Sequence, residues 1–223
     1  KILKEYFKYK KKIVFKKKKF GWIGDVPKHW DLVKPYGLFR PVKRNPDEND
    51  EIITCFRDGQ VTLIKNRRVD GFTVSLKEIG YQKVLKGDLV VHQMDGFEGS
   101  IGVSDSEGKS SPVLTVIPKS NRYNNFYWMY LLRRMSKTGF IESLSKSIRE
   151  RTTEFRWNMW KGLLFCHPPV LEQDQIVEYL NEQTQKIDKT ISIEEKRIEL
   201  LKEYRQSLNS ELVTGKRKVP TYE

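Results

Sequence analysis

The sequence predicts an α+β protein, with a mixed, β-rich globular domain followed by one long C-terminal coiled-coil helix. Two patterns lead to this fold class. Between residues 51 and 117, short apolar and β-branched segments alternate with glycine-containing turns. Between residues 171 and 212, apolar residues recur with heptad spacing, and neither proline nor glycine interrupts the run. A strand-rich region that precedes a helix does not match a doubly wound parallel sheet.

The globular domain begins after a lysine-rich arm. Residues 21–30 carry two tryptophans suited to anchor the chain on a core, and residues 41–50 are polar and contain proline, as in a loop. The first expected hairpin has strands at 51–56 and 61–65, joined by a turn that contains Gly59. Further strands are expected at 71–75, 88–93, 101–104 and 113–117.

Residues 124–147 predict a helix, with a second short helix from 138 to 147, because apolar side chains recur at helical spacing. Four aromatic residues gather at the start of this segment. They favour a helix that faces the core, although they also suit a platform for stacking nucleic-acid bases. The four are Tyr123, Phe126, Tyr127 and Trp128.

The long helix has a seam suited to packing against another helix. With Val177 at a heptad a position and Leu180 at d, eight of the eleven a and d positions are apolar. The helix would extend about 60 Å, as a spacer or docking rod. The alternative is a surface helix packed on its own domain. The eight apolar residues, predicted to form a dimer interface, are Val177, Leu180, Ile187, Ile191, Ile198, Leu201, Leu208 and Leu212.

A formal net charge of +13 and a pI near 9.6 indicate a polyanionic partner. Residues 1–20 contain ten lysines and one glutamate, so this arm carries +9 and leaves +4 for the rest. Lysine attracts phosphate but lacks the planar fork of arginine. The arm therefore suits either non-specific attraction to phosphates or a solvated leader, and the globular domain has to supply any specificity.

The remaining composition excludes several classes of protein. Cys55 and Cys166 stand among apolar residues without metal-binding or redox spacing, which predicts buried thiols in a reducing cytoplasm. The three histidines, His29, His92 and His167, are too far apart in sequence to predict a zinc site. No apolar run approaches the roughly twenty residues of a membrane span, and the basic start lacks the apolar stretch of a signal peptide.

Catalytic motifs are also absent from the sequence. It holds no P-loop, dinucleotide-binding loop or nucleophile elbow, and no N/D-P-P-Y/F motif of DNA methyltransferases. Nucleases that use divalent metal need clustered carboxylates, and Asp88, Asp95 and Glu98 leave that role open. However, Asp88 follows a glycine at a predicted strand start, where a carboxylate usually stabilises a turn. We therefore predict no catalytic residue and no metal ligand.

Four stretches carry recognisable motifs and together span nearly all of the chain after residue 20. They are WIGDVPKHW at 22–30, GDLVVH at 87–92 with FEGSIGVS at 97–104 and SP at 111–112, PPVLEQ at 168–173, and LLKEYRQSL at 200–208 with VTGK at 213–216. In this order and spacing they resemble the specificity subunit of type I DNA restriction-modification systems, in a half-length form with one target recognition domain and one conserved helix. The chain departs from the family in having one copy of each part, and in Val113-Leu114 where a small residue and tyrosine are frequent.

The resemblance implies a non-catalytic subunit that reads half of a bipartite site on double-stranded DNA. Its parts would be a basic arm (1–20), a target recognition domain (21–167), a conserved spacer and dimerisation helix (168–215) and a tail (216–223). Its implied partners are methyltransferase subunits docked on the helix, a restriction subunit and a second copy of this chain, in the cytoplasm and without a membrane. S-adenosylmethionine, ATP and magnesium would be bound by those partner subunits, and this chain would need no cofactor.

Base readout calls for the forked or paired donors of Arg, Lys, Asn and Gln. The candidate DNA-binding residues are Arg57, Gln60, Lys65, Asn66, Arg67, Arg68, Gln93, Arg149, Arg151 and Arg156. Any single one also suits a solvated surface charge, and Asn66-Arg67-Arg68 is the group that we favour. The glycines at 96–102 permit either a close approach to DNA or tight turns in the core.

Two other classes of function stay open. A metal-dependent nuclease would use Asp88, Asp95 and Glu98, and it would cut plasmid DNA in the presence of Mg²⁺. A coiled-coil scaffold would bind only protein, and its affinity for duplex DNA would vanish at about 0.15 M salt.

Overall fold

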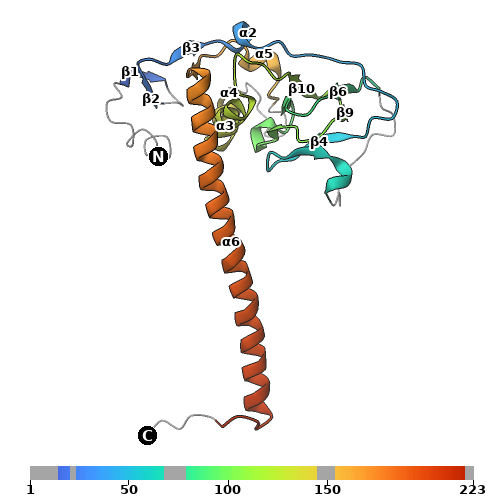
Figure 1. Ribbon diagram of the computed structural model, residues 1–223, viewed down its shortest axis with the longest axis vertical. Coiled ribbons are helices and arrows are strands. Elements are labelled where there is room, and N and C mark those ends of the chain that lie inside the picture. The colour runs from blue at the N-terminus through green and yellow to red at the C-terminus, as the bar shows by residue number, and fades with distance from the viewer. Residues whose placement is uncertain (1–14, 21–23, 68–78, 145–153, 219–223) are drawn as a thin grey trace. The chain divides into compact units, whose positions relative to one another are not determined.

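The computed structural model describes residues 15–20, 24–67, 79–144 and 154–218 (Figure 1). The described strands are β1 (Phe15–Phe20), β2 (Gly24–Pro27), β3 (Asp31–Val33), β4 (Ile53–Cys55), β5 (Val61–Leu63), β6 (Gln82–Val84), β7 (Leu89–His92), β8 (Ile101–Val103), β9 (Gly108–Ser110), β10 (Leu114–Ile117) and β11 (Phe165–His167). The described helices are α2 (Pro35–Leu38), α3 (Asn125–Lys137), α4 (Phe140–Leu144), α5 (Trp157–Trp160) and α6 (Val170–Val213), with 3₁₀ turns η1 (Ile64–Asn66) and η2 (Gly96–Glu98).

The strands form small antiparallel sheets. The largest has the order β10-β7-β8, in which Leu89 of β7 lies opposite Ile117 on one side and Val103 on the other. Two-stranded sheets pair β4 with β5, β6 with β9, β3 with β11 and β1 with β2. The predicted α+β class is confirmed, and the strands expected at 88–93, 101–104 and 113–117 correspond to β7, β8 and β10. The strand expected at 71–75 lies outside the described residues.

The first predicted hairpin is present, but its strands are shorter than expected. β4 and β5 pair through only three residues each, with Thr54 opposite Thr62 at the centre. The second strand ends at Leu63 because the chain enters η1, where the amide of Arg67 donates to the carbonyl of Ile64 over 3.1 Å. Lys65, expected on the strand, therefore lies in a 3₁₀ turn.

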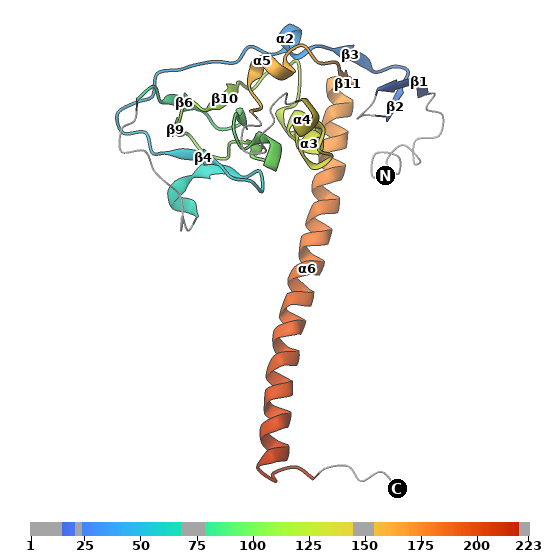
Figure 2. The ribbon, with the colours of Figure 1, turned by 180° about the vertical axis from the view of Figure 1, so that it is seen from behind.

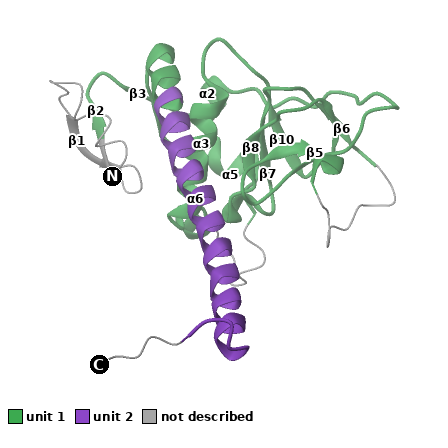
Figure 3. Ribbon diagram, turned by 60° about the horizontal axis from the view of Figure 1, so that its bottom comes forward, with its two compact units in different colours: residues 1–177 green, residues 178–223 purple. Residues whose placement is uncertain are grey.

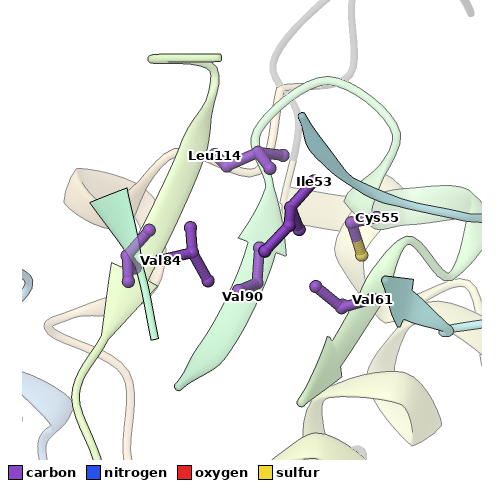
Figure 4. Packing of buried hydrophobic residues seen from close by; sticks show 7 residues of the cluster. Ile53, Cys55, Val61, Val84, Val90 and Leu114 are labelled. Atoms are coloured by element: carbon purple, nitrogen blue, oxygen red, sulfur yellow. The ribbon is translucent and has the colours of Figure 1, made fainter. Parts of the chain in front are cut away.

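A cluster of buried apolar side chains joins strands from three of these sheets. It comprises Ile53, Cys55, Val61, Val84, Val90, Leu114 and Val116. Figure 4 shows Ile53, Val84 and Val90 gathered between the strands. Leu89, Val90 and Val91 are all fully buried, so β7 is covered on both faces. This explains why its sequence is a continuous apolar run instead of an alternating one.

The two helices predicted within 124–147 correspond to α3 and α4, which Figure 2 shows next to each other. The side-chain oxygen of Asn124 accepts hydrogen bonds from the amides of Phe126 and Tyr127, at 2.8 and 3.3 Å, and so caps α3. Gly139, with φ of 69°, follows the end of α3 and separates the two helices. α3 packs against β7 and β8 of the largest sheet.

Three of the four aromatic residues at or just before the start of α3 pack in the core. Trp128 is fully buried and Tyr123 and Tyr127 are nearly so, whereas Phe126 is 45% exposed. The ring of Trp128 lies edge-on to that of Phe39, with 4.7 Å between ring centroids. The interpretation as a core-facing helix holds for three of the four aromatic residues, and those three cannot form a base-stacking platform.

Helix α6 is one continuous helix of 44 residues, which at the usual rise extends about 66 Å. The chain divides into two compact units, residues 1–177 and 178–223, coloured separately in Figure 3, so that α6 contributes its first two turns to the first unit. The predicted long helix is confirmed. Among the described residues, no helix combines the length and the apolarity that crossing a bilayer requires.

A buried glutamine fixes the start of α6 within the first unit. The side-chain oxygen of Gln173 accepts from the amide of Asn124 over 2.9 Å, and its nitrogen donates to the carbonyl of Pro168 over 2.8 Å. Glu172 beside it accepts from the indole of Trp30 over 3.1 Å. Trp30 is almost fully buried, as the sequence predicted for an anchoring tryptophan, and Trp22 lies outside the described residues.

Candidate nucleic-acid interface

A tight turn joins β4 to β5 and carries two of the predicted DNA-binding residues, Arg57 and Gln60. The amide of Phe56 donates to the carbonyl of Gln60, and the amide of Gly59 to the carbonyl of Phe56, both over 2.9 Å. Gly59 adopts a φ of 90°, a left-handed conformation that glycine takes without strain. Both Arg57 and Gln60 are exposed on this turn.

The turn lies directly against the glycine-containing loop at 96–102. A Cβ atom on Gly102 would collide with the carbonyl oxygen of Gly59. The guanidinium of Arg133, from α3, donates to the carbonyl of Gly99 over 2.8 Å and fixes the same loop. These glycines therefore permit close packing inside the domain, which is the second of the two roles considered from the sequence. The packing holds the turn against a rigid support.

Three predicted basic residues of this hairpin are each paired with a carboxylate. The pairs are Arg57 with Glu98, Lys65 with Glu51 and Arg67 with Asp58, at N–O distances of 2.5, 2.5 and 2.8 Å. Exposed pairs of this kind add at most about 1 kcal/mol each to stability. Their main effect is to restrict the cations to one orientation while leaving them accessible from solvent.

Arg67 has a second contact that the sequence did not predict. Its guanidinium lies over the ring of Phe56, 4.1 Å from the ring centroid. Asn66 donates through its side-chain nitrogen to the hydroxyl of Thr62 over 2.8 Å. Arg68, the third member of the favoured group, lies outside the described residues. We call Arg57, Asp58, Gln60, Lys65, Asn66 and Arg67 the β4–β5 face.

The other predicted residues lie elsewhere in the first unit. Gln93, at the end of β7, is half-buried, and its side-chain nitrogen makes long contacts of 3.4 Å to the Thr115 hydroxyl and 3.5 Å to the carbonyl of Pro112. Arg156 is exposed before α5 and pairs with Glu154 at 2.6 Å. Arg149 and Arg151 fall outside the described residues. The structure therefore gathers the residues at 57–67 but gives no common surface for all ten.

The carboxylates considered for a nuclease site have other partners. Asp88 is almost fully buried, accepts from the amide of Leu85 over 3.0 Å and pairs with Arg44. It stabilises a turn, as its position after Gly87 predicted. Glu98 instead pairs with Arg57. Across the residues that the structure describes, no group of three or more His, Cys, Asp or Glu side chains is placed to hold a metal ion.

His92, at the end of β7, is half-buried and accepts hydrogen bonds from the segment that follows it. Its Nδ1 accepts from the amides of Met94 and Asp95, at 3.2 and 3.0 Å. Burial lowers the pKa of the imidazole, and the positive charge of Arg57 lowers it further, against the opposing effect of the Asp95 carboxylate. Burial likewise raises the pKa of the thiols of Cys55 and Cys166, which are both free and buried, as the sequence predicted.

Asp58, the one carboxylate of the β4–β5 face, was not among the predicted residues, because those were chosen as donors to bases. Asp58 stands within the predicted turn, two residues before Gln60, whose amide donates to it over 3.0 Å. That spacing is the signal of an Asx turn and was available from the sequence. The ion pair between Glu98 and Arg57 joins segments that are distant in sequence, so no local pattern predicts it.

The fold is similar to that of a chain in a solved structure described as "Structural basis underlying complex assembly and conformational transition of the type I R-M system". The TM-score is 0.59 at 16% sequence identity, over 85% of this chain and 47% of that chain. The predicted resemblance to type I restriction-modification proteins is thus confirmed at the level of the fold. This chain spans about half the length of the one that it matches.

A second similar structure is described as the HsdS subunit from Thermoanaerobacter tengcongensis. The TM-score is 0.46 at 16% identity, over 78% of this chain and 41% of that one. No family model and no curated protein matches the sequence.

Proposed function

We propose that this chain is a non-catalytic DNA-recognition subunit of a type I restriction-modification system. The observation that carries the proposal is the shared fold, which extends over 85% of the chain. The four sequence stretches that resemble the specificity subunit support the same assignment. The first unit would read one half of a bipartite site on duplex DNA, in the cytoplasm.

The β4–β5 face supports this role. It presents arginine, glutamine and asparagine side chains, which have the paired donors that base edges in the major groove require. Arg57 and Gln60 are exposed on a turn that is packed against the domain, and Arg67 is oriented by Phe56 and Asp58. A rigid presentation reduces the entropy lost on binding, so that each contact retains more of its free energy.

The long helix supports a spacing role. Its seam residues Ile187, Ile191 and Ile198 are each at least half exposed in the single chain, which suits burial against a second α6. Two helices paired antiparallel about a two-fold axis would carry two reading domains, separated by about one to two turns of duplex. Methyltransferase subunits would dock on the paired helices, bringing S-adenosylmethionine, and a restriction subunit would bring ATP-driven cleavage.

The proposal is tested by selecting duplexes from a pool with a random central segment of about two helical turns, at about 0.15 M salt. The full chain should enrich a bipartite motif, and an inverted repeat if the partner is identical. Plasmid incubated with the chain and Mg²⁺ should remain uncut. Enrichment of no motif, or cleavage by the chain alone, would overturn the assignment.

A further inference from the structure

Asp58 uses its two carboxylate oxygens for two different tasks. Oδ1 accepts from the amide of Gln60 over 3.0 Å and so fixes the turn between β4 and β5. Oδ2 accepts from Nη1 of Arg67 over 2.8 Å. One side chain therefore ties the conformation of the turn to the position of a guanidinium nine residues further along the chain.

Arg67 is held on a second side by Phe56. Its guanidinium carbon lies 4.1 Å from the centroid of the Phe56 ring, and Phe56 itself is buried in the domain. Stacking fixes the plane of the guanidinium, and the bond to Asp58 fixes its rotation within that plane. Among the described residues no bond occupies Nε or Nη2 of Arg67, and its side chain is 34% exposed. That edge is a donor pair of the kind that binds guanine O6 and N7.

The carboxylate changes what the arginine attracts. A lone guanidinium binds any phosphate, and this affinity carries no sequence information. Beside Asp58 the pair has little net charge, and a phosphate approaching Arg67 would also meet the negative carboxylate. Directional donation to a neutral base edge survives this neutralisation, because it depends on where the N–H groups point. A repulsive element of this kind raises the ratio of specific to non-specific binding.

We propose that Asp58 is a specificity-determining residue, which suppresses phosphate binding by Arg67 and orients the arginine toward a guanine in the target. The inference rests on the proposed function, since it requires that the first unit reads DNA. It assigns to a carboxylate on the β4–β5 face an active role in discrimination, whereas the donors alone were considered from the sequence.

The test compares the wild type with Asp58→Asn, which keeps an oxygen for the Gln60 amide but removes the charge. Both are used to select from the random duplex pool, and affinities are then measured for the enriched duplex and for a scrambled duplex. We expect the ratio of the two affinities to fall about tenfold in the variant, mainly through tighter binding of the scrambled duplex. The salt dependence for the scrambled duplex should steepen by about one ion.

Two controls separate this effect from simpler ones. Asp105→Asn removes the same charge from a carboxylate that accepts from the hydroxyl of Ser106 instead of from a guanidinium, so its ratio should stay at the wild-type value. In an Arg67→Gln background, which leaves no cation for the carboxylate to neutralise, Asp58→Asn should no longer lower the ratio about tenfold. Asp58→Glu keeps the carboxylate and should still bind the scrambled duplex weakly. It is the second variant to measure if Asp58→Asn does not fold.

The outcomes are distinguishable from failure of the proposed function. If the wild type enriches no motif, the chain is not a DNA reader and the role of Asp58 falls with it. If the wild type enriches a motif but Asp58→Asn keeps the wild-type ratio, or Asp105→Asn lowers it equally, the reader stands and the inference is overturned.

Discussion

Two surfaces of this protein differ in whether their side chains have partners within the same chain. On the β4–β5 face, Lys65, Arg67 and Asn66 each have a partner within the same hairpin or its flanks. On α6 beyond residue 178, Ile187 and Leu201 are both 57% exposed at seam positions. The first surface is complete within one chain, whereas the second presents apolar area that water solvates poorly.

The two surfaces are therefore suited to different kinds of partner. Polar groups that are held by partners in the same chain can donate their remaining N–H groups to DNA with little change in the fold, as reversible DNA binding requires. Exposed apolar side chains repeated along a helix gain about 25 cal/mol for each Å² that they bury, which favours a lasting protein partner. The two surfaces are therefore expected to respond differently to the same kinds of change.

The largest effect is expected on the helix. Replacing Ile191 and Ile198 with Asp places two carboxylates in the seam of each chain, and burying unpaired charge costs several kcal/mol. We expect self-association to weaken at least about a thousandfold, which corresponds to roughly 4 kcal/mol. Sedimentation equilibrium measures this directly.

The control carries Asp at Ser192 and Lys196, which lie on the opposite side of the heptad and are exposed. This variant should associate as the wild type does. A wild type that stays monomeric, or seam and control variants that behave alike, would show that α6 has no self-pairing seam.

A smaller effect is expected beneath the β4–β5 face. Gly102→Ala should lower the free energy of unfolding by about 3 kcal/mol, because the added methyl group would collide with the carbonyl of Gly59 and force the turn away from its support. Urea denaturation gives the value. Gly37→Ala is the matched control, since a Cβ there meets no atom within 4 Å and alanine favours the helix α2. Equal stability of both variants would contradict the close packing of the turn.

The comparison also shows what the sequence can predict. The seam of α6 follows from a heptad repeat, a local pattern, and the helix was found at Val170–Val213 where 171–212 was predicted. The turn at 57–60 follows from glycine in a polar segment between β-branched residues. Each of these two patterns is formed by residues that are close together in sequence, so local rules are sufficient to detect it.

Contacts between distant segments were not predictable in the same way. The bond between Gln173 and the amide of Asn124 joins residues 49 positions apart, and that between Arg133 and Gly99 joins residues 34 apart. The strands β6 and β9 were also missed, because each has only three residues and lacks a strong apolar pattern. Such elements are fixed by tertiary packing, which no local propensity encodes.

Acid should affect the first unit through two half-buried imidazoles. The folded-state pKa values of His92 and His167 are lowered, mainly by burial, so below pH 6.5 the unfolded chain takes up protons that the folded chain does not. The free energy of unfolding should therefore fall as pH decreases below 6.5, by at most about 1.4 kcal/mol per pH unit for each histidine.

The pH effect is measured by urea denaturation at a series of pH values. His92→Asn is the informative variant, because the Asn oxygen can accept from the amides of Met94 and Asp95 but does not titrate. Its stability should fall less steeply with acid than that of the wild type. Identical pH profiles would mean that His92 is protonated as easily in the folded chain as in the unfolded one.

The smallest change in stability is expected for Lys65→Ala. This variant separates the effect of a residue on DNA binding from its effect on folding. The pair that Lys65 forms with Glu51 is exposed on both sides, so its loss should alter the free energy of unfolding by no more than about 0.5 kcal/mol. DNA affinity should nevertheless fall, with a salt slope lower by about one ion, if Lys65 reaches a phosphate in the complex. Lys43→Ala removes an exposed charge outside the β4–β5 face and should leave that slope unchanged. Equal slopes for the two variants would remove Lys65 from the DNA-binding set, because a residue whose loss changes neither stability nor binding is a solvated surface charge.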